Sequence, residues 1–98
     1  MRPKKTRWVK CEPGERSFRP KGVPVKYLED IFLTLDEFEA VRLADYEQLT
    51  QVQAAKQMKV HRSTISRILT AAHKKIADAF VNKKSIKVQG GCCKFTRR

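Results

Sequence analysis

Residues 50–82 read TQVQAAKQMKVHRSTISRILTAAHKKIADAFVN, and this stretch decides the fold. Its first residues form a capping box, in which the hydroxyl of Thr50 accepts the backbone N–H of Gln53 while the Gln53 side chain reaches back to the start of the helix. The box predicts a short helix over residues 51–57. Within it, Ala54 and Ala55 are small enough to let another helix approach closely.

A second, longer helix is predicted from Arg62 to about Asn82, with its N-cap at His61 or Arg62. No glycine or proline interrupts this span. Its apolar residues recur at spacings of three and four, which is the pattern of one buried helix face. These residues are Ile65, Ile68, Leu69, Ala72, Ile76, Ala79 and Phe80. We therefore expect one continuous helix whose opposite side faces solvent.

Only the residues from Met58 to His61 are left to join these two helices. Helices joined by so short a link must cross steeply, as they do in a helix-turn-helix motif. Met58 and Val60 flank the turn and are expected to point inward. Lys59 stands where glycine is the easier choice, because the left-handed backbone conformation costs a residue with a side chain on the order of 1 kcal/mol.

A third helix is predicted upstream, from Leu35 to about Tyr46, because Thr34 and Glu37 form another capping box.

The flanks are less regular. Residues 1–26 hold four prolines, whereas residues 86–89 alternate like a short strand that could pair with residues 7–11.

We thus expect a mainly α fold, a three-helix helix-turn-helix domain of the winged or sigma-region-four-like type. An irregular basic N-terminal arm would occupy residues 1–26, the helix-turn-helix domain residues 27–82, and a basic C-terminal tail residues 83–98. The short strand in that tail would give a terminal β pairing.

Charge is distributed in blocks along the chain. The 98 residues carry 22 Lys and Arg against 10 Asp and Glu, a net charge of +12. Residues 1–26 hold nine cations and two acids (+7), residues 27–49 one and seven (−6), and residues 50–98 twelve and one (+11). So large a positive charge indicates a polyanionic partner. The acidic block either lies on a face away from that partner or pairs with the basic blocks inside the molecule, and the sequence allows both.

The length of 98 residues leaves room for one small domain and no deep catalytic cleft. No nucleophile, base and orienting group stand at a known spacing, and no glycine-rich phosphate loop is present, so we expect no enzymatic activity and no cofactor. No apolar run reaches the length of a membrane span, and the N-terminus resembles no signal peptide, which predicts a cytoplasmic protein.

The cysteines are Cys11, Cys92 and Cys93, an odd number, and we expect reduced thiols. A metal site is the weaker alternative. Pairing of the two termini could gather the three thiolates, with a histidine or a cluster completing the site. However, no Cys-x2-Cys spacing exists, and adjacent cysteines point to opposite faces of an extended strand. We therefore expect no metal.

The middle of the chain resembles region four of bacterial sigma factors. The similarity lies in residues 49–55, in Met58-Lys59-Val60-His61-Arg62 and in residues 72–77. Together with Phe18-Arg19-Pro20, residues 35–40, Arg42-Leu43 and Gly90-Gly91, nearly the whole chain is similar to uncharacterised protein family 0251, a family of small prokaryotic predicted DNA-binding proteins. The resemblance implies a helix-turn-helix DNA-binding fold and a role in transcription regulation, without a known target.

The buried residues of the long helix decide which side chains could face DNA. If residues 62–70 enter a major groove, the base-contacting candidates lie opposite the buried stripe. They are Arg62, Ser63, Ser66, Arg67 and Thr70. The two arginines are the strongest, because a guanidinium can donate two hydrogen bonds to guanine. Candidates for contact with the DNA backbone lie at helix starts, on the basic face and in the arm. They are Thr50, Gln51, Gln53, His61, Lys74, Arg2, Lys4, Lys5 and Arg7.

Double-stranded DNA is therefore the expected partner, read in a sequence-specific way by a transcriptional regulator. Two alternatives stay open. The acidic residues 27–49 could dock on the transcription machinery or on a metal-cluster assembly factor, or the chain could bind structured RNA, which ranks lower because few aromatic residues are available for stacking. A homodimer would read two half-sites, with Val81, Ile86, Val88 and Phe95 as its interface or as part of the core.

Overall fold

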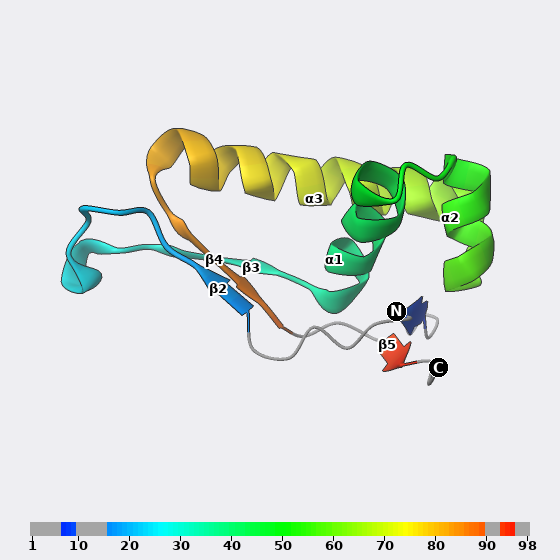
Figure 1. Ribbon diagram of the computed structural model, residues 1–98, viewed down its shortest axis with the longest axis horizontal. Helices are drawn as coiled ribbons and strands as arrows, with labels where there is room; N and C mark the ends of the chain where they lie inside the picture. The colour runs from blue at the N-terminus through cyan, green and yellow to red at the C-terminus, as the bar shows by residue number, and fades with distance from the viewer. Residues whose placement is uncertain (1–6, 10–15, 90–92, 96–98) are drawn as a thin grey trace, which may run out of the picture.

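Within residues 7–9, 16–89 and 93–95, which the computed structural model describes, three α-helices make up most of the regular structure. Helix α1 spans Leu35–Val41, helix α2 spans Gln51–Met58 and helix α3 spans Arg62–Asn82. Each begins where the capping pattern predicts. The long helix α3 runs across the top of Figure 1, with α1 and α2 grouped toward one of its ends. The predicted mainly helical fold is confirmed.

Helix α1 starts with the predicted capping box. The hydroxyl of Thr34 accepts the N–H of Glu37 at 3.4 Å, and the Glu37 carboxylate accepts the N–H of Thr34 at 2.9 Å. The helix then widens into η2, a π-helix over Arg42–Tyr46, in which the N–H of Glu47 donates to the carbonyl of Arg42 at 2.8 Å. Because such widening leaves no mark in the spacing of apolar residues, the sequence predicts where this helix ends but not the form of its last turn.

An ion pair ties α1 to η2. The Arg42 Nε donates to Glu39 Oε1 at 2.7 Å and its Nη2 donates to Glu39 Oε2 at 2.9 Å, while only 1% of Glu39 is exposed. A buried carboxylate needs such a partner, because an unpaired charge is costly away from water. The pair therefore holds η2 in line with α1.

The link between α2 and α3 is as short as predicted. Lys59 adopts the left-handed conformation, with φ 55° and ψ 45°, and Val60 donates its N–H to the carbonyl of Ala55 at 3.0 Å. The chain therefore turns within residues 59–61, and α3 begins at Arg62. Helix α2 lies across the first turns of α3, which is the helix-turn-helix arrangement (Figure 1).

Apolar side chains of all three helices and of η2 meet in one buried cluster. Its members are Ala40, Leu43, Ala54, Ala55, Met58, Ile65, Ile68 and Leu69. Val60 is half-buried and packs against them, so both residues that flank the turn point inward as predicted. Since burial of a large aliphatic side chain contributes about 1.5–3 kcal/mol, the cluster fixes how α3 is rotated about its own axis.

A three-stranded sheet packs against α3. Its strands, in order across the sheet, are β2 (Arg16–Phe18), β4 (Ser85–Val88) and β3 (Asp30–Leu33). The central strand β4 runs antiparallel to β2 and parallel to β3. Leu33 and Val88 of the sheet form a second buried cluster with Ala72 of α3. The sheet therefore ties segments from both flanks of the helical region to the long helix.

The predicted pairing of residues 86–89 with residues 7–11 is wrong. The strand β4 pairs with β2 and β3, whereas β1 (Arg7–Val9) pairs in parallel with β5 (Cys93–Phe95). A terminal β pairing is therefore present, but between different partners. The reason is that β4 is the central strand, with β2 on one side and β3 on the other, so neither of its edges is left for residues 7–11.

The two outer strands were not predicted. We expected residues 1–26 to be irregular because of their prolines, but Pro20 and Pro24 follow β2 and leave its ladder intact. The strand β3 is short, and Asp30 meets its partner Ser85 from 55 residues further along the chain. Local patterns carry no trace of so distant a pairing.

The apolar residues expected near the C-terminus divide between core and surface. Val88 is buried and Ile86 is half-buried, whereas Val81 is 73% exposed. Phe80 was expected on the buried face of α3 but is 86% exposed, so that part of the prediction is wrong: the buried stripe ends at Ala79. The side chain of Phe95 lies outside the described part of the structure. The divisions of the chain after residues 26 and 82 stay predictions. Among the described residues, no helix has the length and apolar character needed to cross a membrane.

The turn residue Lys59 gives a first prediction. We compare Lys59→Gly with Lys59→Ala, because both remove the lysine side chain beyond Cβ, and only glycine, which has no Cβ, adopts φ 55° without a steric clash. The glycine variant should be more stable than the alanine variant by about 1 kcal/mol, measured by urea unfolding. An alanine variant of equal or higher stability would show that residue 59 is not left-handed in solution.

The buried Ser85 gives a second prediction. Its hydroxyl donates to Asp30, and this bond, followed by Lys87 at 3.3 Å, holds the pKa of Asp30 below its ordinary value. A carboxylate with a lowered pKa stabilises the fold above its unfolded-state pKa of about 3.9 and loses that contribution as the pH falls through its folded-state pKa. Ser85→Ala should therefore lower the free energy of unfolding most near neutral pH, with a smaller deficit below about pH 4.

Urea unfolding at about pH 7 and about pH 3 measures this difference. The matched control is Ser17→Ala, at an exposed position of the neighbouring strand β2, which should show no pH-dependent deficit. A Ser85→Ala deficit of the same size at both pH values would contradict the coupling to Asp30.

Candidate nucleic-acid interface

The interface begins at the N-terminus of α2, where a capping box holds the chain. The hydroxyl of Thr50 accepts the N–H of Gln53 at 3.2 Å, and Gln53 Oε1 accepts the N–H of Thr50 at 2.9 Å. Thr50, Gln51 and Gln53, all predicted to contact a DNA backbone, are exposed here. The remaining N–H groups of a helix start favour an anion, so this end of α2 is suited to a phosphate.

The start of α3 is fixed by His61. Its Nδ1 accepts the N–H of Ser63 at 3.2 Å and lies 2.9 Å from the Ser63 hydroxyl oxygen. His61 is therefore the N-cap, which decides between the two boundaries that the sequence left open. With Nδ1 accepting, the neutral ring carries its proton on Nε2 and can donate a hydrogen bond to an external acceptor.

The buried stripe of α3 places the five base-contacting candidates on the solvent side. Ile65 is fully buried, and Ile68 and Leu69 are 7% and 5% exposed. The candidates on the opposite side are exposed, as predicted: Arg62, Ser63, Ser66, Arg67 and Thr70. Thr64 is half-buried. The structure therefore brings the predicted set together on one helix face.

The hydroxyls and guanidinium groups of this face differ in how they are engaged. Thr70 Oγ1 donates to the carbonyl of Ser66 at 2.9 Å, one turn back in the same helix. Arg62 and Arg67 form no ion pair with any residue that the structure describes. Two exposed guanidinium groups with uncompensated charge therefore lie within the first two turns of α3.

Two neighbouring lysines of α3 have different surroundings. Lys74 is exposed and lies seven residues after Arg67, on the same side of the helix. Lys75 faces the body of the protein, where its Nζ donates to Glu37 Oε1 at 2.7 Å and to the carbonyl of Phe32 at 2.9 Å. Adjacent residues of a helix point in different directions, so only Lys74 extends the exposed face that carries Arg62 and Arg67.

The acidic block pairs with the basic block within the molecule. Contacts of 2.7–3.7 Å join four carboxylates of residues 27–49 to basic side chains of α3, of β4 and of the link between them. The pairs are Glu29–Lys84, Asp30–Lys87, Glu37–Lys75 and Asp45–His73. Of the two explanations that the sequence allows, internal pairing holds for these residues. No acid lies between residues 62 and 77 of α3, so the face with the arginines stays basic.

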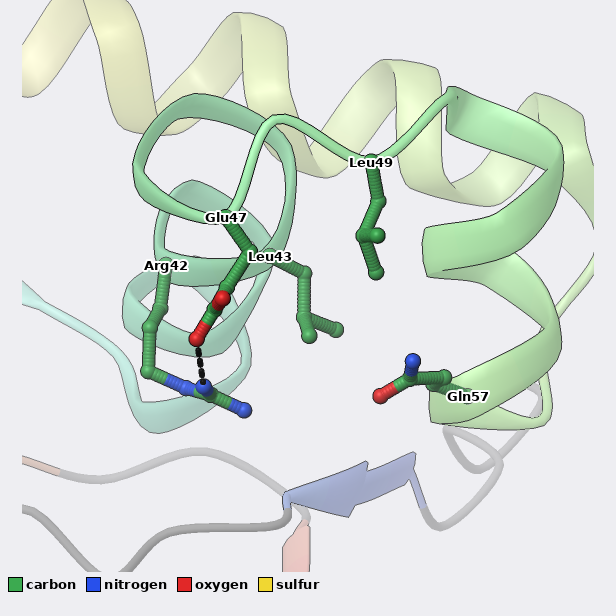
Figure 2. Close-up of a pocket in the computed structure, with 5 residues that line it drawn as sticks. All are labelled: Arg42, Leu43, Glu47, Leu49 and Gln57. Carbon is green, nitrogen blue, oxygen red and sulfur yellow. Dashed lines mark hydrogen bonds and ion pairs between the residues drawn. The ribbon is translucent and has the colours of Figure 1, made fainter.

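A hollow of about 140 Å³ between η2 and α2 was not foreseen. Figure 2 shows Leu43 and Leu49 on its walls, with the side chain of Gln57 extending into it from α2. Its charged groups, Arg42 and Glu47, pair with each other at 3.3 Å. These residues are spread along the chain without a motif, so the sequence offers no signal for the hollow. Its small size and paired charges assign it to the packing of α2 on η2.

Part of the predicted site lies outside the described residues. This holds for Arg2, Lys4, Lys5, Cys11 and Cys92. The backbones of Arg7 and Cys93 are described and face each other in the β1–β5 pair, but their side chains are not. Within the described ranges, no group of three His, Cys, Asp or Glu side chains is placed to hold a metal ion.

Comparison with known proteins gives consistent matches over almost the whole chain. A family model described as protein of unknown function DUF134 matches residues 1–96. The chain is 52% identical over 90 residues to a UPF0251 protein of Caldanaerobacter subterraneus subsp. tengcongensis, covering 92% of this chain and 76% of that protein. It is 44% identical over 97 residues to a UPF0251 protein of Methanosarcina mazei, covering 99% of this chain and 59% of that protein. No solved structure matches.

The family that the sequence resembles is thereby confirmed. The likeness to region four of sigma factors has no counterpart among these matches and stays a prediction. A match over residues 1–96 takes in both flanking segments as well as the helices, so the family shares more than a short helical motif. The chain belongs to the DUF134 family, whose members include the UPF0251 proteins.

Proposed function

We propose that this protein binds double-stranded DNA in a sequence-specific way and acts as a transcriptional regulator. One observation carries the proposal. Arg62 and Arg67 are exposed on the first turns of a helix whose rotation is fixed by buried side chains, and neither forms an ion pair with a described residue. Arginines held in this way can donate paired hydrogen bonds to guanine without first breaking an internal contact.

The dimensions of the helix pair suit a duplex. A major groove about 12 Å wide admits one helix of about 10–12 Å diameter, and the N-terminal residues of that helix reach the base edges. In this arrangement α3 reads bases, while the start of α2 at Thr50 and Gln51 lies against the DNA backbone. His61 and Lys74 flank the reading turns and would also contact phosphates. The protein binds in this role and catalyses no reaction.

The alternative partners have less support. A docking face on residues 27–49 needs free carboxylates. Three of its acids are less than 9% exposed, and the four exposed ones each lie within 3.7 Å of a basic side chain of this protein: Asp36, Glu37 and Glu39 are buried, and Glu29, Asp30, Asp45 and Glu47 are paired. Structured RNA offers a deep and narrow major groove that a helix such as α3 does not enter. Duplex DNA is therefore the partner that fits both the shape and the charge of the exposed face of α3. We name this face, which carries Arg62, Ser63, Ser66, Arg67 and Thr70, the reading face.

A single motif of this kind reads few base pairs, so two copies on adjacent half-sites would lengthen the sequence that is recognised. Among the apolar residues expected to form a dimer contact, Val88 belongs to the core and Val81 remains 73% exposed. We include a homodimer on near-palindromic DNA in the proposal, with Val81 at the surface between copies.

The two arginines give the third prediction. A preferred site is first selected from a pool of random duplexes, and binding to it and to a scrambled duplex is then measured by fluorescence anisotropy. The combined variant Arg62→Ala, Arg67→Ala should lose most of its preference, because each bidentate contact to guanine contributes roughly 1–3 kcal/mol of discrimination. The ratio of the two dissociation constants should approach one.

The matched control is Lys74→Ala, which removes a cation from the same helix face. It should weaken binding to both duplexes equally and lower the salt dependence of log K by about 0.9 for one lost phosphate contact. Equal losses on both duplexes for the arginine variant would count against base reading by α3. Failure of the wild-type protein to bind either duplex would refute DNA binding itself.

A further inference from the structure

The segment that joins β2 to β3 is a loop of defined shape. It passes through Pro20, Gly22 and Pro24 into η1, a short 3-10 helix over Val25–Tyr27. The N–H of Tyr27 donates to the carbonyl of Pro24 at 2.9 Å, which closes this turn. Gly22 has φ 90°, a conformation that strains any residue with a side chain. Prolines and a turn bond restrict this backbone, so the loop would lose little conformational entropy on binding a ligand.

The loop carries three cations that form no internal ion pair within the described residues. Between residues 16 and 28 the chain has four Lys and Arg and no acid. Arg19, Lys21 and Lys26 are exposed, and none of the three forms an ion pair with a described residue. We name these three residues the loop cations.

The segment ends with one acid, Glu29, and β3 begins with another, Asp30, and both pair with lysines. Glu29 lies 3.7 Å from Lys84, and Asp30 lies 3.3 Å from Lys87, both lysines of or next to the central strand β4. Both carboxylates therefore make their ion pairs with these lysines, although the charge of Arg19 also acts on Asp30 from beyond ion-pair distance. The electrostatic field of the loop tip is left positive, which favours a polyanion as its ligand.

The loop also presents apolar and aromatic surface that the fold does not use. Val25 is 69% exposed and Tyr27 is 70% exposed, and neither belongs to a buried cluster. The Lys26 ammonium lies 5.1 Å from the centre of the Tyr27 ring. Val25 and Tyr27 add little to the buried core, so packing does not explain their presence at the surface of the loop.

The loop lies at the opposite end of α3 from the reading face. Arg19 and Pro20 line a surface hollow together with Phe80 and Lys83, which belong to the end of α3. Figure 1 shows the loop at the far end of the molecule from α2. The 21 residues of α3 span about 31 Å at 1.5 Å per residue, which corresponds to about nine base pairs of duplex at 3.4 Å each.

We propose that the β2–β3 loop is a second DNA-contacting surface, whose loop cations bind the sugar-phosphate backbone of a duplex away from the segment that α3 reads. This inference rests on the proposed DNA binding. The ligand is duplex phosphate in either of two settings: the next part of the same duplex, or a second duplex that the protein holds beside the first. The surface adds affinity and carries no sequence preference, because phosphates are the same at every base pair.

The test uses a loop-neutral variant of the full chain, Arg19→Ala, Lys21→Ala, Lys26→Ala. Its matched control keeps the charge, with Arg19→Lys, Lys21→Arg and Lys26→Arg. Binding is measured by anisotropy, across a salt series, on a duplex of about one helical turn (about 10 base pairs) and on one of about 25 base pairs. A second assay measures energy transfer between donor-labelled and acceptor-labelled short duplexes, which reports whether one protein brings two together.

If the loop contacts the same duplex, the loop-neutral variant should bind the long duplex more weakly, with the salt slope of log K reduced by roughly 2 to 3, and bind the short duplex like wild type. If it holds a second duplex, the variant should lose the energy-transfer signal. The charge-keeping control should match wild type in both assays.

Wild-type behaviour of the loop-neutral variant in both assays would overturn the second surface, even while the arginines of α3 still determine site preference. An equal loss on both duplex lengths with no change in energy transfer would also overturn it, because such a loss reports only a lower total charge. Absence of binding by the wild-type protein would remove the proposed function and this inference together.

Discussion

The burial of Ile65 and Ile68 against α2 is the constraint on which the rest of the structure depends. A rotation of α3 that exposed these two side chains would lower the free energy of unfolding by about 1.5–3 kcal/mol for each. This is more than a surface ion pair contributes. Ala54 and Ala55 make the burial geometrically possible, because small side chains let the two helices approach. With the rotation fixed, Arg62 and Arg67 have no direction open to them except solvent.

The same packing determines which charged side chains form ion pairs within the molecule. Three lysines pair with carboxylates of α1, of β3 or of the residue before β3, so their charges are balanced within the molecule. They are Lys75, Lys84 and Lys87. The arginines of α3 and the loop cations lie where no acid of the described chain pairs with them. Among the described residues, the reading face and the β2–β3 loop therefore keep cations without an internal ion pair, and these are the surfaces that we propose for a polyanion.

The helices could be predicted from the sequence because their signals are local. Thr34 and Thr50 each act with a residue three positions ahead, and both capping boxes form as expected. The sheet could not, because β4 meets β3 only after the whole helical region has intervened. The exposed candidates of α3 could be predicted from helical periodicity. The defined shape of the β2–β3 loop could not, because its prolines indicate an irregular arm. Turn bonds such as that from Tyr27 to Pro24 give this loop its shape, and composition does not reveal them.

The most direct test of this account is an NMR titration of the arginine side-chain Nε–Hε signals with the selected duplex. The account predicts that the signals of Arg62 and Arg67 shift and become protected from exchange, while the half-buried Arg42 side chain keeps its free-state signal through its pair with Glu39. Unchanged signals for both α3 arginines together with a shift of the Arg42 signal would contradict it and locate the binding surface on the acidic block, residues 27–49, instead.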